Sequence, residues 1–140
     1  MNKLNTIDQV EIIKLQKIVG RDANMTIFDK IDKYFIIKRV FTVNNNILLN
    51  KRGHHAHKNC KQIITCPYGS IKFKVYDGKR SKIFKISNNN KAIYVPNYIW
   101  TETTYLSENA TLVCYCSNYY NEKSYMRDIV KFLKIRAANF

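Results

Sequence analysis

Apolar and polar residues alternate with a period of two through the middle of the chain, as they do in half-buried β-strands. The alternation is uninterrupted over residues 70–76, where Ile71, Phe73 and Val75 share one face. An Asp-Gly pair follows at residues 77–78 and predicts a tight hairpin turn. The return strand and the other short strands are predicted at residues 82–86, 10–18, 35–43, 63–66, 93–95, 99–103 and 111–117.

A helical period appears only near the C-terminus, between residues 122 and 137, where apolar side chains recur at intervals of three and four. Many short strands followed by one helix predict an all-β sandwich or barrel with the helix packed outside it. At 140 residues the chain is most simply a single domain, residues 1–140, large enough to bury a core without disulfides. The helix is predicted to bury Met126, Ile129, Val130 and Leu133.

The sequence shows no segment that would direct the chain to or through a membrane. No apolar run reaches the roughly 20 residues of a membrane span, and residues 1–15 lack the continuous apolar stretch of a signal peptide. We therefore expect a cytoplasmic protein with no membrane partner and with its four cysteines reduced. Cys114 and Cys116 alternate within an apolar run and are predicted to be core residues.

The formal net charge of +14 raises the question of a nucleic-acid partner. The lysines are dispersed, however, and form no block of five or six basic residues. Lys, Asn, Ile and Tyr are abundant together, and all four have A/T-rich codons, so a low-GC genome is an alternative explanation of the charge. We expect no nucleic-acid partner, while the basic surface favours a phosphorylated substrate through long-range attraction.

All three histidines of the chain lie within residues 52–58. In an extended strand His55 and His57 point to one side, about 7 Å apart, and His54 points to the other. Two neighbouring imidazoles suit metal binding or proton transfer near neutral pH. A chance cluster in a surface loop is the alternative interpretation.

The spacing around these histidines resembles the first motif of the cupins, small double-stranded β-barrels of the jelly-roll kind. That motif continues from His-x-His to a Glu after four residues and a Gly after six more, and these positions hold Gln62 and Gly69. The second motif has a Pro and then a ligand histidine, and here Pro96 is followed by Thr101. The resemblance implies a cupin-like barrel with a C-terminal helix. Because only two of the four usual ligands are present, we expect no metal and no cofactor.

Further motifs extend in a fixed order from about residue 18 to residue 133. They are Ile37-Lys38-Arg39-Val40, Arg52-Gly53-x-His55-Ala56-His57-Lys58, Gln62, Gly69, Tyr94-Val95-x-x-x-x-Trp100 and Ser117-x-Tyr119-Tyr120-x-Glu122-x-x-Tyr125-x-Arg127. In this combination the chain resembles the sugar 3,4-ketoisomerases. The resemblance implies a metal-independent transfer of the ketone from C4 to C3 of thymidine-diphosphate-4-keto-6-deoxyglucose. The product would feed an aminotransferase on the route to 3-amino sugars of surface glycans.

The implied reaction gives the paired imidazoles definite roles. A base must remove the C3 proton, which the C4 carbonyl acidifies, and hydrogen bonds must stabilise the enediolate before a proton returns to C4. We assign His55 as the leading base and His57 as the partner that polarises the oxygens or shuttles the proton, with the reverse order as the alternative. Positive surroundings are expected to lower the histidine pKa values and keep at least one imidazole neutral.

The resemblance also indicates substrate contacts. Arg39 and Arg52 hold matching motif positions, and guanidinium groups suit a diphosphate, although a solvated strand end is the alternative for Arg39. Trp100 and Tyr120 are candidates for the walls of the sugar or base pocket, with a plain core position as the alternative. Arg21 occupies the place of an Arg-Gly-Ser-type turn and is a further candidate. Gln62 is either a substrate contact or a hydrogen-bonded core residue.

Two other classes of function stay open. A cupin epimerase would act on the same kind of nucleotide sugar, but Asp77 and Glu102, the nearest carboxylates, lie outside the His-x-His motif. A non-catalytic module would bind sugar or nucleic acid through its basic face. We also expect a homodimer, because the predicted strand at residues 10–18 is a candidate sheet edge and such edges are normally paired. Both C4 configurations of the product, gluco and galacto, remain open.

Overall fold

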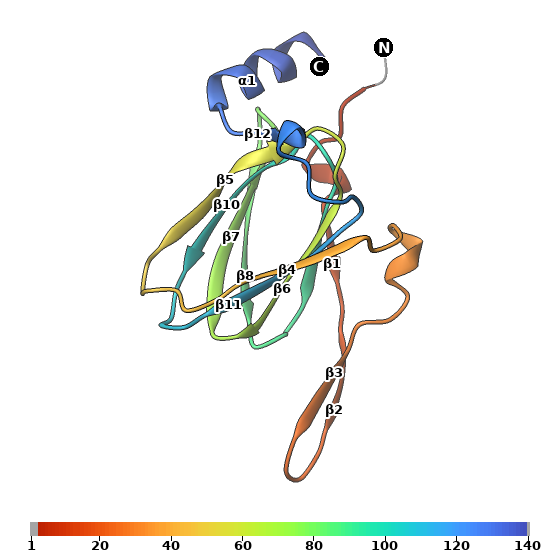
Figure 1. Cartoon of the computed structure of the whole chain (residues 1–140), viewed down its shortest axis with the longest axis vertical. Helices are drawn as coiled ribbons and strands as arrows, with labels where there is room; N and C mark the ends of the chain where they lie inside the picture. Colours follow the sequence, from red (N-terminus) through yellow and green to blue (C-terminus); the bar gives the residue numbers. More distant parts are fainter. Residues whose placement is uncertain (1–2, 140) are drawn as a thin grey trace.

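Two antiparallel β-sheets face each other across an apolar core, and a single α-helix lies at one end of the barrel that they form (Figure 1). This computed structural model describes residues 3–139. In chain order the elements are η1 (Ile7–Gln9), β1 (Glu11–Ile13), β2 (Gln16–Val19), β3 (Asn24–Ile27), η2 (Ile31–Lys33), β4 (Arg39–Val43), β5 (Lys51–His57), β6 (Gln62–Tyr68), β7 (Ser70–Tyr76), β8 (Ser81–Ser87), β9 (Ala92–Val95), β10 (Trp100–Tyr105), β11 (Thr111–Cys116), η3 (Glu122–Ser124), β12 (Tyr125–Met126) and α1 (Ile129–Ala138).

The strand order is β1-β9-β6-β11-β4 in one sheet and β12-β5-β10-β7-β8 in the other. Strands distant in the sequence are therefore neighbours, as in a jelly roll, and every pairing in the two sheets is antiparallel. The predicted all-β, cupin-like barrel with a C-terminal helix is confirmed.

The core is built from the alternating apolar residues. Ile71, Phe73 and Val75 of β7 are fully buried, and the register places Ile71 opposite Ile86 and Phe73 opposite Phe84 of β8. Burying such a side chain stabilises the fold by about 1.5–3 kcal/mol. The predicted inner face of β11 is buried as well, and it consists of Leu112, Cys114 and Cys116.

The N-terminal region differs from the prediction of one strand over residues 10–18. It contains β1, which pairs with β9 at the edge of the barrel, and β2, which pairs with β3 in a separate hairpin. Strand β1 ends at Ile13 because Ile13 pairs with Ala92, the first residue of β9. Beyond this point β9 offers no residue for pairing, and the chain leaves the barrel. Figure 1 shows the β2–β3 hairpin projecting away from the barrel.

The C-terminal helix also differs from the prediction. It begins only after Asp128, whose carboxylate accepts backbone N–H groups at the helix N-terminus, and the residues before it form η3 and β12. The predicted apolar face is wrong at Ile129, Val130 and Leu133, which are exposed, and right for the burial of Met126, which lies in β12 instead of the helix. The helix instead buries Phe132 against Trp100 and, one turn later, Arg136. An aromatic surface on the barrel and a set of carbonyl acceptors thus determine the buried face.

Among residues 3–139, no helix has the length and apolar character needed to cross a membrane.

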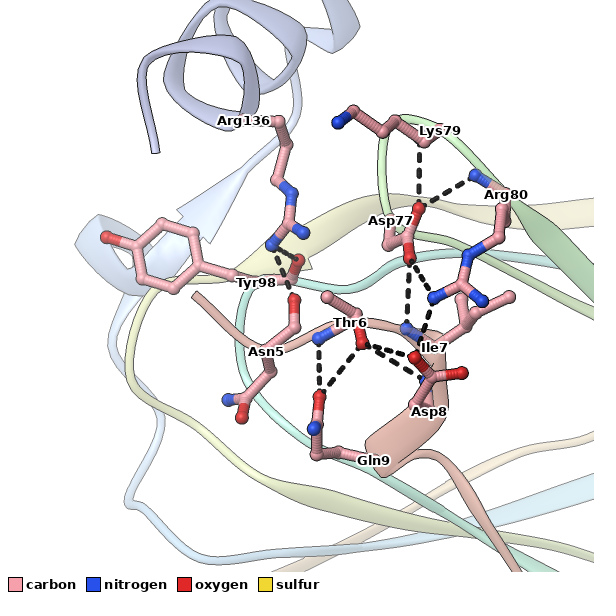
Figure 2. Close-up of polar contacts among 10 residues, drawn as sticks. All are labelled: Asn5, Thr6, Ile7, Asp8, Gln9, Asp77, Lys79, Arg80, Tyr98 and Arg136. Atoms are coloured by element: carbon pink, nitrogen blue, oxygen red, sulfur yellow. Dashed lines mark hydrogen bonds and ion pairs between the residues drawn. The ribbon is translucent and has the colours of Figure 1, made fainter. Parts of the chain in front are cut away.

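Asp77, in the turn between β7 and β8, ties the N-terminal segment to the barrel (Figure 2). Its side chain is 1% exposed and accepts the backbone N–H groups of Ile7 (3.1 Å), Lys79 (2.9 Å) and Arg80 (2.8 Å). Burial alone would raise the pKa of Asp77, but these donors and the charge of Arg136 outweigh it and lower the pKa. The carboxylate is therefore charged at neutral pH.

Arg136 ties the C-terminal helix to the same region. Its guanidinium donates to the carbonyl oxygen of Asn5 at 2.6 Å and to that of Tyr98 at 3.4 Å, as Figure 2 shows. The two ends of the chain are therefore joined through buried polar groups at one end of the barrel.

Replacing Asp77 with Ala should lower the free energy of unfolding by about 3 kcal/mol at pH 7, because three N–H groups lose a charged acceptor. The lowered pKa means that this stabilisation exists above pH ~4 and is lost as the pH falls through the folded-state pKa. Urea denaturation at pH 7 and pH 3 measures both effects. Asp8→Ala is the control, since Asp8 pairs with Arg80 at an exposed site and should matter far less. Equal losses in the two variants would contradict the role of Asp77.

Candidate active site

The histidine motif lies on β5, where a β-bulge interrupts the alternation. Opposite β10, His55 pairs with Thr101 and Gly53 pairs with Glu102, so His54 is the extra residue. Gly53 has φ +88° and His54 has φ 55°. A Cβ at Gly53 would lie 3.0 Å from the carbonyl oxygen of Thr101, and the positive φ disfavours other residues there.

The bulge decides which side chains of β5 share a face. Arg52 and His55 are three residues apart and would point to opposite faces in a regular strand. With one extra residue between them, both line the same cavity. His54 points to the outer face, half exposed, with Nδ1 3.7 Å from a carboxylate oxygen of Glu102. The predicted separation of His54 from the pair is confirmed by this geometry.

A cavity of about 230 Å³ lies inside the barrel, between the two sheets. Its apolar walls come from β4, β6, β7 and β11. In the described part of the chain, none of the side chains that line it is a carboxylate. The polar lining consists of Arg52, His55, Gln62, Thr101, Thr103, Tyr105, Tyr125 and Arg127.

The two imidazoles lie close together but at different depths. The ring centroids of His55 and His57 are 4.9 Å apart, with the rings nearly perpendicular. His55 lines the cavity, whereas His57 is 5% exposed and lies behind it. Neither ring nitrogen of His57 has a hydrogen-bond partner within residues 3–139. His55 is therefore the imidazole that a bound molecule can reach.

Burial and positive charge keep both imidazoles neutral. Burial lowers the pKa of His55, and the charge of Arg127 lowers it further. The pKa of His57 falls to about 3, first through burial and then through the charges of His55 and Arg39. A neutral imidazole in the cavity can accept a proton at neutral pH, so His55 has the state that a general base needs.

The predicted arginines differ in position. Arg52 lines the cavity, but Arg39 does not. Its guanidinium donates to the Cys116 thiol at 3.4 Å and lies 5.5 Å from the ring centroid of Tyr120. Gln62 lines the cavity and also donates to Cys116, at 3.7 Å. Arg39 thus acts on His57 through its charge, while Arg52 and Gln62 can meet a ligand directly.

Tyr125 and Arg127 are cavity residues that sequence reasoning did not select. The guanidinium of Arg127 lies 4.4 Å from the ring centroid of Tyr125 and is held by Glu122 at 2.9 and 3.2 Å. Tyr120 is mostly exposed and donates its hydroxyl to the same carboxylate at 2.6 Å. The only sequence signal for Tyr125 and Arg127 was their presence in the motif at residues 117–127.

Two predicted contacts lie away from the cavity. Trp100 points to the outer face of β10 and packs under α1 against Phe132 and Met126, so it does not wall the cavity. For Trp100 the structure has the alternative of a plain core position, and the next residue, Thr101, lines the cavity instead. Arg21 lies at the tip of the β2–β3 hairpin, outside the cavity of its own chain.

Across residues 3–139, no three His, Cys, Asp or Glu side chains are placed to hold a metal ion.

The chain was compared with known families and structures. The family model described as "FdtA: WxcM-like, C-terminal" matches residues 8–137. The TDP-4-oxo-6-deoxy-alpha-D-glucose-3,4-oxoisomerase of Aneurinibacillus thermoaerophilus is 28% identical over 125 residues, covering 89% of this chain and 90% of that protein.

Solved structures of similar proteins cover nearly the whole chain. QdtA, a sugar 3,4-ketoisomerase from Thermoanaerobacterium thermosaccharolyticum in complex with TDP, has a TM-score of 0.86 and 28% identity, covering 94% of this chain and 96% of that one. A histidine-to-asparagine mutant of the same enzyme, in complex with TDP-4-keto-6-deoxyglucose, has a TM-score of 0.87 and 27% identity over the same shares, 94% and 96%.

The lowered pKa of His57 predicts a pH-dependent stability. Below pH ~6.5 His57 binds a proton in the unfolded chain, but in the folded protein it stays neutral until the pH approaches about 3. The free energy of unfolding should therefore fall with decreasing pH in this window, by up to ~1.4 kcal/mol per pH unit from this residue. His57→Asn removes the group and should flatten the dependence between pH 6 and pH 4, measured by urea denaturation. An unchanged slope would contradict a buried neutral imidazole.

Proposed function

Because the chain belongs to the FdtA family and is a sugar 3,4-ketoisomerase, we propose that it converts TDP-4-keto-6-deoxyglucose into the 3-keto isomer. The observation that carries this proposal is the neutral, cavity-facing imidazole of His55 beside the guanidinium groups of Arg52 and Arg127. A base next to positive charge suits proton abstraction from a substrate that carries a diphosphate. The ligands of the similar solved structures, TDP and TDP-4-keto-6-deoxyglucose, support the substrate class.

His55 removes the proton from C3, which the adjacent C4 carbonyl makes acidic. The electrons form a C3–C4 double bond, and the negative charge that develops at O4 is stabilised by the positive groups that line the cavity. Return of a proton to C4 gives the 3-keto product.

The diphosphate binds at Arg52, because this guanidinium lines the cavity and can form bidentate hydrogen bonds with phosphate oxygens. Arg39 supports the site through its charge and is a weaker candidate for direct contact. Gln62, which lines the cavity, would hydrogen-bond the hexose. Tyr120, which is exposed and does not line the cavity, would contact the nucleoside.

The reaction runs without a metal or another cofactor. Of the positions that match the ligand positions of cupins, Gln62 and Thr101 offer neutral oxygens, which are weak ligands for transition metals, and His57 lies behind the cavity. The enzyme works in the cytoplasm, and its product serves an aminotransferase that makes 3-amino-3,6-dideoxy sugars for surface glycans.

Incubation with TDP-4-keto-6-deoxyglucose after exhaustive chelation, followed by a 3-aminotransferase and NMR of the amino sugar, tests the proposal and identifies the C4 configuration. Wild-type protein should form the 3-amino product. His55→Asn should lower turnover by about 10²–10⁴-fold, because it removes the base but keeps side-chain size.

The matched control is His54→Asn, on the outer face of the same strand, which should retain near-normal turnover. Loss of activity on chelation that a divalent metal restores would overturn the metal-free reaction. A stronger effect of His54→Asn than of His55→Asn would show that the assigned face of β5 is wrong.

We also propose that the protein is a homodimer in which the β2–β3 hairpin of one copy lies along β4 of the other. The hairpin exposes Ile18, Val19 and Met25, and β4 is an edge strand with Val40 exposed. Apolar side chains next to an unpaired edge favour strand addition. Residues of β4 line the cavity, so a hairpin laid on this strand would bring Arg21 of the second copy beside it.

Charges on the hairpin should separate the two copies. Ile18 and Met25 are cross-strand partners, so the double substitution Ile18→Glu and Met25→Glu places two carboxylates at one point of the proposed contact. Light scattering at micromolar concentration should give a dimer mass for the wild type and a monomer mass for the variant. Ile83→Glu, at an exposed apolar position of β8, is the control and should stay dimeric. A monomeric wild type would refute the dimer.

A further inference from the structure

Tyr125 is a second proton-carrying side chain that faces the same cavity as His55. The pairing of β12 with β5 places Tyr125 opposite His57. Its ring centroid lies 5.0 Å from that of His55 and 4.3 Å from that of His57. Because His57 lies behind the cavity, His55 and Tyr125 are the adjacent pair that one bound sugar can meet.

The surroundings of Tyr125 suit a hydroxyl that gives up a proton and takes it back. Burial raises the pKa of Tyr125, so the phenol is protonated at neutral pH, while the charges of Arg39 and Arg127 oppose the rise. Arg127 is fixed over the ring by Glu122, so its charge stays near the oxygen. A phenolate formed for a short time would be stabilised by these two guanidinium groups.

The neighbouring base has the complementary state. His55 is neutral at neutral pH and can accept a proton, whereas Tyr125 holds one that it can donate. Two titratable groups whose environments place them in opposite protonation states form an acid and base pair. The other tyrosine of the cavity, Tyr105, has a pKa of about 12, raised by burial, and no described contact joins its ring to either imidazole ring.

We propose that Tyr125 is a catalytic residue that carries a proton between O4 and O3 of the hexose, while His55 carries a proton between C3 and C4. This assignment rests on the proposed function. In the first step His55 takes the proton of C3, the C3–C4 double bond forms, and O4 takes the proton of the Tyr125 hydroxyl. In the second step the Tyr125 phenolate takes the proton of O3, the C3 carbonyl forms, and C4 takes the proton from His55. Both side chains return to their first state, and no other reagent is consumed.

This scheme changes the role of His57. Its ring packs edge-on against both His55 and Tyr125, so it is a positioning residue rather than the second proton carrier. A further consequence is that one imidazole removes and returns the carbon-bound proton from the same face of the sugar ring. The new C4 hydrogen must then lie on the face from which the C3 hydrogen left.

Tyr125→Phe tests the proposal, because it removes the hydroxyl and keeps the ring that packs on the two imidazoles. Turnover of TDP-4-keto-6-deoxyglucose should fall by about 10²-fold or more, while TDP binding measured by calorimetry should be unchanged. Tyr115→Phe is the matched control, since Tyr115 points to the opposite side of β11 and packs near Phe28. It should keep wild-type turnover.

A fluorinated tyrosine at position 125 separates proton transfer from packing. Fluorination lowers the pKa of the phenol with little change in shape, so the alkaline limb of the kcat profile should move to lower pH by the same amount. An active Tyr125→Phe variant, or an alkaline limb that does not move, would overturn the role of Tyr125 while leaving the proposed function in place. A wild-type protein that does not isomerise the sugar in the same assay would overturn both.

Discussion

At Gly53 and His54, strand β5 gains one residue over its partner β10, and this offset determines which side chains of β5 share a face. Without it, Arg52 and His55 would lie on opposite faces of the sheet. With it, a guanidinium and an imidazole reach the same cavity, and His54 is left on the outer surface. The bulge needs glycine at position 53, where φ is +88° and a Cβ would meet the Thr101 carbonyl oxygen at 3.0 Å. One backbone irregularity therefore brings together, on a single strand, the residues that we propose as the diphosphate contact and the base.

The chemistry of the cavity follows from burial combined with positive charge. Both conditions disfavour protonated imidazoles, and the pKa values of His55 and His57 are lowered accordingly. Arg127 lowers the pKa of both imidazoles and also lines the cavity, so the same charge would stabilise an anionic substrate and the negative charge that develops in the reaction. Positive charge in the cavity would therefore favour substrate binding, a neutral base and the negative charge that develops in the proposed reaction.

The C-terminal segment completes the cavity and joins it to the ends of the chain. Tyr125 and Met126 pair with β5, which places the Tyr125 ring next to the two imidazoles. Arg127 lies over the Tyr125 ring. Directly afterwards α1 buries Phe132, and Arg136 binds the carbonyl oxygens of Asn5 and Tyr98. Tyr125 and Arg127 therefore lie directly before the helix whose contacts join it to the N-terminal segment, which Asp77 also holds.

The alternating pattern did not predict the division of residues 10–18 into β1 and β2, or the short strand β12. It did predict most of the barrel strands, the buried face of β7 and the outward position of His54. These features are local, because a strand with one apolar face has one way to bury it. Tertiary structure alone decided the bulge that redirects Arg52, and the position of Trp100 under the helix instead of in the cavity. It also decided that α1 buries Phe132 and Arg136 rather than Ile129 and Leu133, and that Arg21 lies on a projecting hairpin. The hydrophobic pattern shows which side chains gain free energy from burial. The surface that covers them is made by strands distant in the sequence, so it exists only in the assembled barrel.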